Sequence, residues 1–88
     1  MCMDELWNRI RNYEGETFFT ATGLPFTYTI LGGEKLQPIR EGSPRWIVSR
    51  ATLEKAVSML HEKKAVFNRA IIAPSYVYAI LTDPRIAG

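Results

Sequence analysis

The sequence contains very little cysteine and histidine, which excludes several kinds of site. Its 88 residues include one cysteine, Cys2, and one histidine, His61. One cysteine cannot form an internal disulfide, and secreted domains of this size usually need disulfides, so we expect a cytoplasmic protein. A single Cys and a single His leave no spacing typical of a zinc site. We therefore expect neither a disulfide framework nor a bound metal.

Long apolar runs are absent as well. No stretch approaches the roughly 20 apolar residues of a membrane-spanning helix. Residues 1–5 are acidic, whereas a secretory signal begins with basic residues. The sequence therefore predicts no membrane partner. The length suits one domain, residues 1–88, and no repeat, linker or low-complexity tract divides it.

Motifs that carry catalysis are missing too. The sequence has no glycine-rich phosphate-binding loop and no Gly-x-Ser-x-Gly nucleophile elbow. Its nine carboxylates are scattered, and paired-acid catalysis needs a cleft that so short a chain rarely forms. His61 stands in a charged Leu-His-Glu-Lys-Lys segment, which is typical of a solvated histidine. We expect a binding protein without a cofactor rather than an enzyme.

Apolar side chains recur at helical spacing near the start of the chain and again after residue 49. Residues 4–13 carry such a stripe, with Asp4 and Glu5 at the positive end of the helix dipole. A second stripe runs through residues 50–62, with Ser49 as the helix N-cap. This helix either continues to about residue 70 or breaks between residues 62 and 64.

A last helix is predicted to begin at Pro74, which suits the first helical position. It must end at Asp83, because Pro84 disfavours helical backbone at the residue before it. The short tail that follows is expected to pack Ile86 onto the core.

The segment between the first two helices alternates aromatic or aliphatic residues with threonine, which is typical of half-buried strands. Glycine and proline punctuate it at turns. The predicted strands cover residues 17–22, 26–30, 34–40 and 45–48.

The register of the central hairpin depends on the length of its loop. A two-residue loop, Gly32-Gly33, would place Tyr28 opposite Gln37 and mix polar residues into the apolar face. A three-residue loop, residues 31–33, places Tyr28 opposite Leu36 and separates the two faces. We therefore predict the three-residue loop.

Two further expectations concern the later strands. Pro38 has no amide hydrogen, so the strand over residues 34–40 is expected to lie at a sheet edge or to carry a bulge. In the strand over residues 45–48, Trp46 and Val48 are expected to share one face.

Strands that are grouped rather than alternating with helices favour the α+β class. The predicted architecture is a small antiparallel sheet of three to four strands. An N-terminal helix and two C-terminal helices pack on one face of it.

The candidate binding residues are Arg40, Arg45, Trp46 and Arg50. The whole chain has a net charge of only +2, but residues 40–50 hold three arginines against one glutamate. Arginines beside a stackable ring suit phosphate and base contacts. Arg50 is a cation at the positive end of the second helix's dipole, which is unfavourable, and a bound anion there would offset this cost. This cluster predicts nucleic-acid binding. The competing interpretation is that Trp46 packs in the core and the arginines are solvated around it.

A protein-interaction module or homodimer is the alternative function. Tyr76 and Tyr78 lie about 200° apart on the last helix, so both cannot face one core. Tyr78 and Trp7 are the candidate interface residues, because exposed tyrosine and tryptophan are typical interface anchors.

Overall fold

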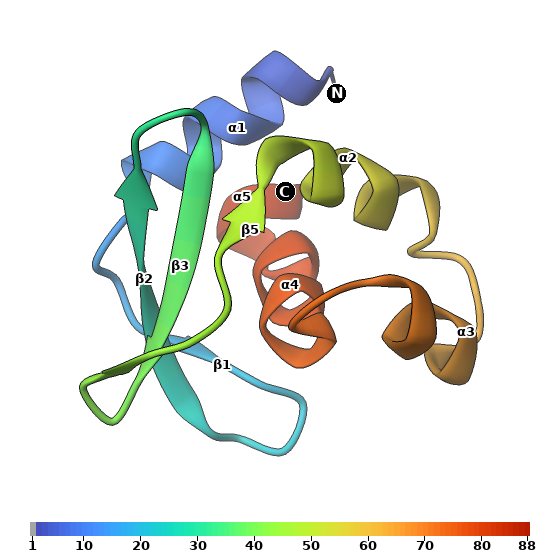
Figure 1. Ribbon diagram of the computed structural model, residues 1–88. Helices are drawn as coiled ribbons and strands as arrows, with labels where there is room; N and C mark the ends of the chain where they lie inside the picture. Colours follow the sequence, from blue (N-terminus) through green and yellow to red (C-terminus); the bar gives the residue numbers. More distant parts are fainter. Residues whose placement is uncertain (1) are drawn as a thin grey trace.

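An N-terminal helix, an antiparallel sheet and a group of C-terminal helices follow one another in the computed structural model, which describes residues 2–88 (Figure 1). This order confirms the α+β class, although residues 50–88 form four helices where two were predicted. The elements are α1 (Met3–Asn12), β1 (Phe18–Phe19), β2 (Pro25–Leu31), β3 (Lys35–Arg40), β4 (Ser43–Pro44), β5 (Val48–Ser49), α2 (Arg50–Ser58), α3 (Lys64–Ala70), α4 (Pro74–Thr82) and α5 (Pro84–Ala87).

Strand β3 lies in the middle of the sheet. Strand β2 pairs with one side of it, while β5 pairs with its first residues and β4 with its last ones. The predicted alternative of an edge strand was therefore wrong, and β3 carries no bulge in its pairing with β2. Pro38 is accommodated because it faces the gap between β4 and β5, where its carbonyl accepts a hydrogen bond of 2.8 Å from the Arg45 amide. Because Pro38 cannot donate a hydrogen bond in return, the Arg45 carbonyl accepts one from the Gln37 side chain instead, and the β3–β4 pairing ends here.

The β2–β3 loop has three residues as predicted, but it begins one residue later, at Gly32. Tyr28 lies opposite Pro38 and Ile30 opposite Leu36, so the predicted Tyr28–Leu36 pair was wrong. The two-residue alternative is also excluded, since Gln37 lies opposite Thr29. A shift of two residues leaves every side chain on its predicted face, which is why the apolar pattern cannot detect it.

The predicted strand over residues 45–48 was wrong as well. The chain leaves the sheet after β4 and returns at β5, so Trp46 lies in an irregular segment. Trp46 is 65% exposed while Val48 is fully buried, and the two do not share a face. The competing interpretation that Trp46 packs in the core is thereby excluded.

The helices follow the apolar stripes closely, and their ends resolve the open alternatives. The Ser49 hydroxyl caps α2 by accepting a hydrogen bond from the Thr52 amide at 3.2 Å. Helix α2 ends at Ser58 and α3 begins at Lys64, so a break is confirmed and the single long helix is excluded. The predicted helix end at residue 62 was wrong, because the chain leaves the helix four residues earlier. The predicted tail forms α5, which buries Ile86 completely.

One core joins all the layers, with the helices covering one face of the β2–β3 hairpin (Figure 1). Tyr28 connects the sheet to α1, since its hydroxyl donates a buried hydrogen bond of 2.5 Å to the Ile10 carbonyl. In the part of the chain that is described, no single helix is long and apolar enough to cross a membrane. Helices α3 and α4 together are long and apolar enough, but the chain bends by 116° between them.

Candidate functional site

The structure divides the predicted arginine–tryptophan cluster into two parts. Arg40 pairs with Ser43 at one end of β3, whereas Lys35 pairs with Ser49 at the other end. Five residues of strand separate these ends, about 17 Å at the usual rise per residue. Arg40 therefore lies at one end of β3 and Arg50 at the opposite end. Arg45, whose amide donates to the Pro38 carbonyl, and the adjoining Trp46 lie beside the middle of the strand.

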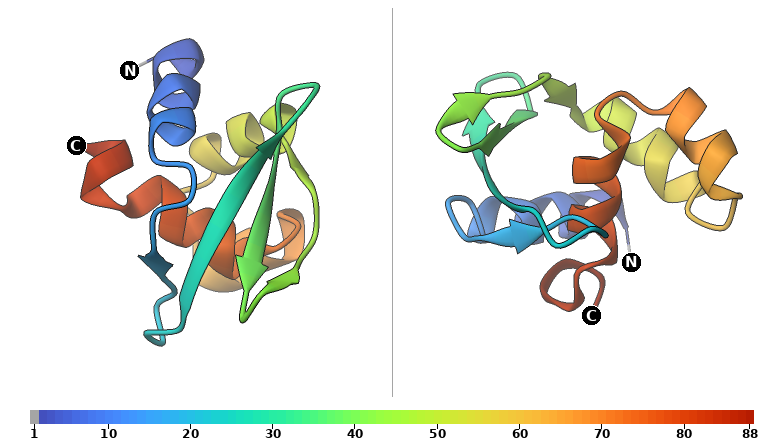
Figure 2. Two further views of the ribbon diagram at one scale, coloured as in Figure 1. Left: turned by 90° about the vertical axis from the view of Figure 1, so that its left-hand side faces the viewer. Right: turned by 90° about the horizontal axis from the view of Figure 1, so that it is seen from below.

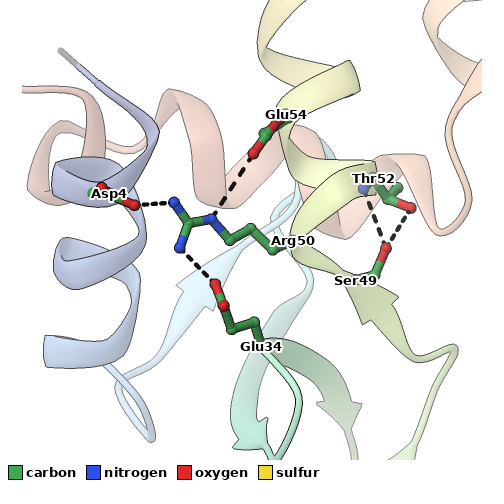
Figure 3. A network of polar contacts seen from close by, with 6 residues as sticks. All are labelled: Asp4, Glu34, Ser49, Arg50, Thr52 and Glu54. Carbon is green, nitrogen blue, oxygen red and sulfur yellow. Dashed lines mark hydrogen bonds and ion pairs between the residues drawn. The ribbon is translucent and has the colours of Figure 1, made fainter.

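Arg50 is held in an internal ion network rather than offered to a ligand. Its guanidinium contacts Asp4 of α1, Glu34 of the β2–β3 loop at 2.5 Å and Glu54 of α2 at 3.9 Å (Figure 3). The hydrogen bonds that Arg50 donates to Asp4, and then to Glu34, raise the pKa of Arg50 further. The expected anion at the start of α2 is replaced by these carboxylates, so we remove Arg50 from the candidate site.

The loop residue Glu34 reaches Arg50 by adopting a left-handed backbone. Its φ is +57°, a region that residues other than glycine rarely adopt. In this conformation its carbonyl also accepts a hydrogen bond of 2.9 Å from the Arg50 amide. These contacts explain why the loop begins at Gly32 rather than at Leu31.

Arg45 and Trp46 form the exposed bridge between β4 and β5. The Arg45 carbonyl accepts a hydrogen bond of 2.9 Å from the Gln37 side-chain amide, which fixes the bridge to β3. Its Nε is buried and has no hydrogen-bond partner within residues 2–88. Trp46 and the neighbouring Ile47 are both exposed. The bridge thus holds a half-buried cation next to an exposed ring.

The two predicted interface residues have different environments. Trp7 is 5% exposed, because Leu6, Trp7 and Ile10 form the buried side of α1. Trp7 is a core residue, so its prediction as a surface anchor was wrong. Tyr78 is 44% exposed, and its ring packs edge-on against Phe67 of α3 with centroids 5.4 Å apart.

A groove that the sequence did not reveal lies beside Arg40, with a volume of about 330 Å³. This is at the lower end of the usual range for small-molecule sites. Its walls come from the β1–β2 turn, the end of β3, the segment leading into α3, α3 itself and the first turn of α4. The lining residues are Thr20, Ala21, Thr22, Leu24, Arg40, Glu62, Lys64, Phe67, Asn68, Pro74, Ser75, Tyr76 and Tyr78.

Aromatic contacts hold the groove in shape. Tyr76 packs edge-on against Phe26 of β2, with ring centroids 4.9 Å apart, and Tyr78 packs in the same way on Phe67. The turn into α4 passes through Ala73, whose φ of +49° is left-handed. This bend could not be predicted from the sequence, because alanine rarely adopts a left-handed backbone.

Charged groups line the groove from opposite elements. Arg40 comes from β3 and Lys64 from α3, while Glu62 lies on the same rim as Lys64. Arg40 makes a marginal ion pair with Glu41, at 4.0 Å. The groove thus combines a ring-lined interior with two cations and one carboxylate at its edge.

Within residues 2–88, no three His, Cys, Asp or Glu side chains gather in a way that would hold a metal ion. Comparisons of the chain with protein-family models, with curated proteins and with solved structures returned no significant match. What the site binds must therefore be inferred from its own residues.

Proposed function

We propose that this protein binds single-stranded nucleic acid, without catalysis, through Arg40, Arg45 and Trp46. The observation that carries the proposal is the exposed Trp46 ring on a backbone bridge that also bears Arg45. Stacking on an aromatic ring together with cationic contacts to phosphate is the usual way in which proteins hold unpaired nucleotides. Arg40 lies on β3 two residues from Pro38, whose carbonyl bonds the Arg45 amide.

The distribution of ion pairs supports this surface. Of the 11 Lys and Arg residues, Arg9, Arg50 and Arg85 are matched by carboxylates within 3.7 Å. Seven others form no ion pair in the described part of the chain, among them Arg45 at the proposed surface and Lys64 in the groove beside Arg40. Unmatched cations are the ones whose counterions a phosphate backbone would replace.

A single strand fits this surface better than a duplex does. Major-groove recognition needs a helix with polar side chains on an accessible face. Helix α4 buries Val77, Ile80 and Leu81, and α3 is only seven residues long. An exposed ring, by contrast, contacts bases that are not already stacked in a duplex.

The test is a binding titration with labelled single-stranded DNA, single-stranded RNA and duplex DNA at several salt concentrations. We expect affinity for single strands that falls with salt. Arg45→Gln should lower the slope of log K against log salt by about 0.7 for the lost phosphate contact. Trp46→Ala should weaken binding at least about fivefold, whereas Trp46→Phe should retain most of it.

Arg11→Gln is the matched control, since Arg11 is an exposed cation on α1, away from the β3–β4 end. It should leave affinity close to that of the unchanged protein. Absence of binding, or binding that does not depend on salt, would overturn the proposed function.

A protein-interaction role is the second candidate, and the adjacent exposed side chains of Trp46 and Ile47 favour it. Large exposed apolar side chains of this kind anchor protein interfaces. Light scattering at two protein concentrations tests self-association. A concentration-dependent dimer that Trp46→Glu abolishes would support this candidate, and a strict monomer would contradict the homodimer.

A further inference from the structure

We infer that the groove beside Arg40 holds one nucleotide unit, with the base inside and the phosphate at the rim. The inference rests on the proposed function, because it names what the same end of the molecule recognises in a strand. The shared chemistry is a planar ring joined to an anionic group. A free mononucleotide and the end of a strand both supply it.

The interior of the groove suits a planar ring. Pro74, Tyr76 and Tyr78 come from the start of α4, and Phe67 faces them from α3. Both tyrosine rings are held edge-on against a neighbouring ring, so the aromatic lining is already in place. A preformed apolar interior reduces the ordering cost of binding a flat ligand.

Polar side chains in the groove suit the edge of a base. Asn68 offers both a donor and an acceptor, and Ser75 and Thr22 add hydroxyl groups. Base edges also carry donors and acceptors together, so these groups find partners on a nucleotide. An alkyl chain would instead leave them desolvated without a hydrogen bond. The lining therefore favours a nucleotide over a lipid tail.

Cations from two different elements line the groove. Arg40 comes from the end of β3 and Lys64 from the start of α3, so a phosphate bound between them would join the sheet to the helices. Glu62 on the same rim opposes an anion. Removing a cation should therefore lower the affinity for an anionic ligand, whereas removing the Glu62 carboxylate should raise it.

The test uses adenosine 5′-monophosphate and adenosine as probes, with binding followed by shifts of backbone amide resonances. We expect adenosine 5′-monophosphate to bind more tightly than adenosine and to shift residues of α3 and the first turn of α4. Lys64→Gln should weaken the monophosphate about two- to fivefold, as expected for one exposed charge contact. Glu62→Gln should strengthen it by a similar factor, and neither change should alter the affinity for adenosine.

Stacking is tested separately. Tyr78→Ala should weaken both probes, whereas Tyr78→Phe should retain the affinity for both. Tyr78 is partly exposed, and circular dichroism of each variant shows whether the fold persists. If Tyr78→Ala unfolds the protein, the signed effects of Lys64→Gln and Glu62→Gln still decide the question.

The two sources of the ligand are distinguished with a tetranucleotide that does or does not carry a 5′-phosphate. A preference for the phosphorylated strand that Lys64→Gln removes identifies the strand end as the ligand. Free monophosphate binding without strand binding assigns the groove to mononucleotides and overturns the proposed strand function. A third outcome is that Trp46→Ala abolishes strand binding, the groove variants leave it unchanged, and the monophosphate shifts no resonance. That outcome overturns the groove inference and leaves the proposed strand binding intact.

Discussion

Tyr28 connects the sheet to α1 through a buried hydrogen bond. It is fully buried between the hairpin and α1, and its hydroxyl donates to the Ile10 carbonyl at 2.5 Å. Burial raises its pKa well above the ordinary value near 10, although the charge of Arg85 acts in the opposite direction. Both observations mean that the folded protein requires the neutral, hydrogen-bonded phenol.

Replacing this phenol should destabilise the protein measurably. Tyr28→Phe keeps the ring but removes the donor, and we expect a loss of about 1 kcal/mol in the free energy of unfolding. Urea denaturation measures this difference. The matched control is Tyr76→Phe, whose hydroxyl makes no hydrogen bond within residues 2–88. Equal losses in the two variants would contradict the assigned role of the Tyr28 hydroxyl.

The same residue predicts how stability changes at high pH. Because the folded pKa of Tyr28 lies above the unfolded value of about 10, its contribution is complete below pH 10 and is lost as the pH rises further. Between pH 10 and 12, the unchanged protein should therefore lose stability more steeply than Tyr28→Phe does. Urea titrations at several pH values in that window test this. Parallel curves would show that Tyr28 ionisation does not limit alkaline stability.

At the scale of the element, the β3–β4 turn carries an avoidable strain. Glu41 and Gly42 have φ values of +53° and +73°, the pattern of a type I′ turn between Arg40 and Ser43. Asparagine tolerates a left-handed backbone far better than glutamate does. The ion pair that Glu41 makes with Arg40 spans 4.0 Å at the surface, so its loss costs little.

Glu41→Asn should therefore stabilise the protein, by roughly 0.5–1 kcal/mol. Glu41→Gln removes the same charge without the conformational preference and should not stabilise it. Thermal denaturation of the two variants separates conformation from charge. In the nucleic-acid titration, both variants should bind single strands more tightly, since each removes a carboxylate beside Arg40. A stability gain in both variants would point to charge rather than to the turn.

Several elements could be predicted from the sequence because each rests on local chemistry. The stripes of α1 and α4 and the cap at Ser49 lie within single segments, and the faces of the β2–β3 hairpin follow from strict alternation. The exact register could not be predicted, because a slip of two residues preserves the faces. In the observed register Glu34 contacts Arg50, sixteen residues away, which no local pattern reveals.

The candidate site was predicted less well for a similar reason. Arg40, Arg45 and Arg50 are close in sequence, but the length of β3 separates Arg50 from Arg40. The groove joins segments as distant as Thr20 and Tyr78, which no local spacing reveals. Local patterns thus identified residue types suited to binding, and the tertiary fold decided which of them meet.

At the scale of the whole molecule, the two ends of the chain close one core. Helices α1 and α5 lie side by side near the two termini (Figure 2). The Arg9 guanidinium donates hydrogen bonds to the carbonyls of Ile86 and Gly88, at 3.0 and 2.9 Å. Ile86 belongs to the same buried cluster as Leu6 and Phe18. Helix α5 is therefore part of the core rather than an appended tail.

This arrangement predicts that a change in the last helix destabilises the whole protein. Ile86→Ala removes a completely buried side chain and should cost about 2–4 kcal/mol, a large share of the 5–15 kcal/mol typical of a domain. Because one core joins all the layers, unfolding should stay two-state. In a Trp46→Phe background, the fluorescence of buried Trp7 reports on α1, and far-ultraviolet circular dichroism reports on all the helices. Their urea transitions should coincide and shift together in Ile86→Ala. Transitions that separate, with α5 lost before Trp7 is exposed, would show that α5 unfolds independently of the core.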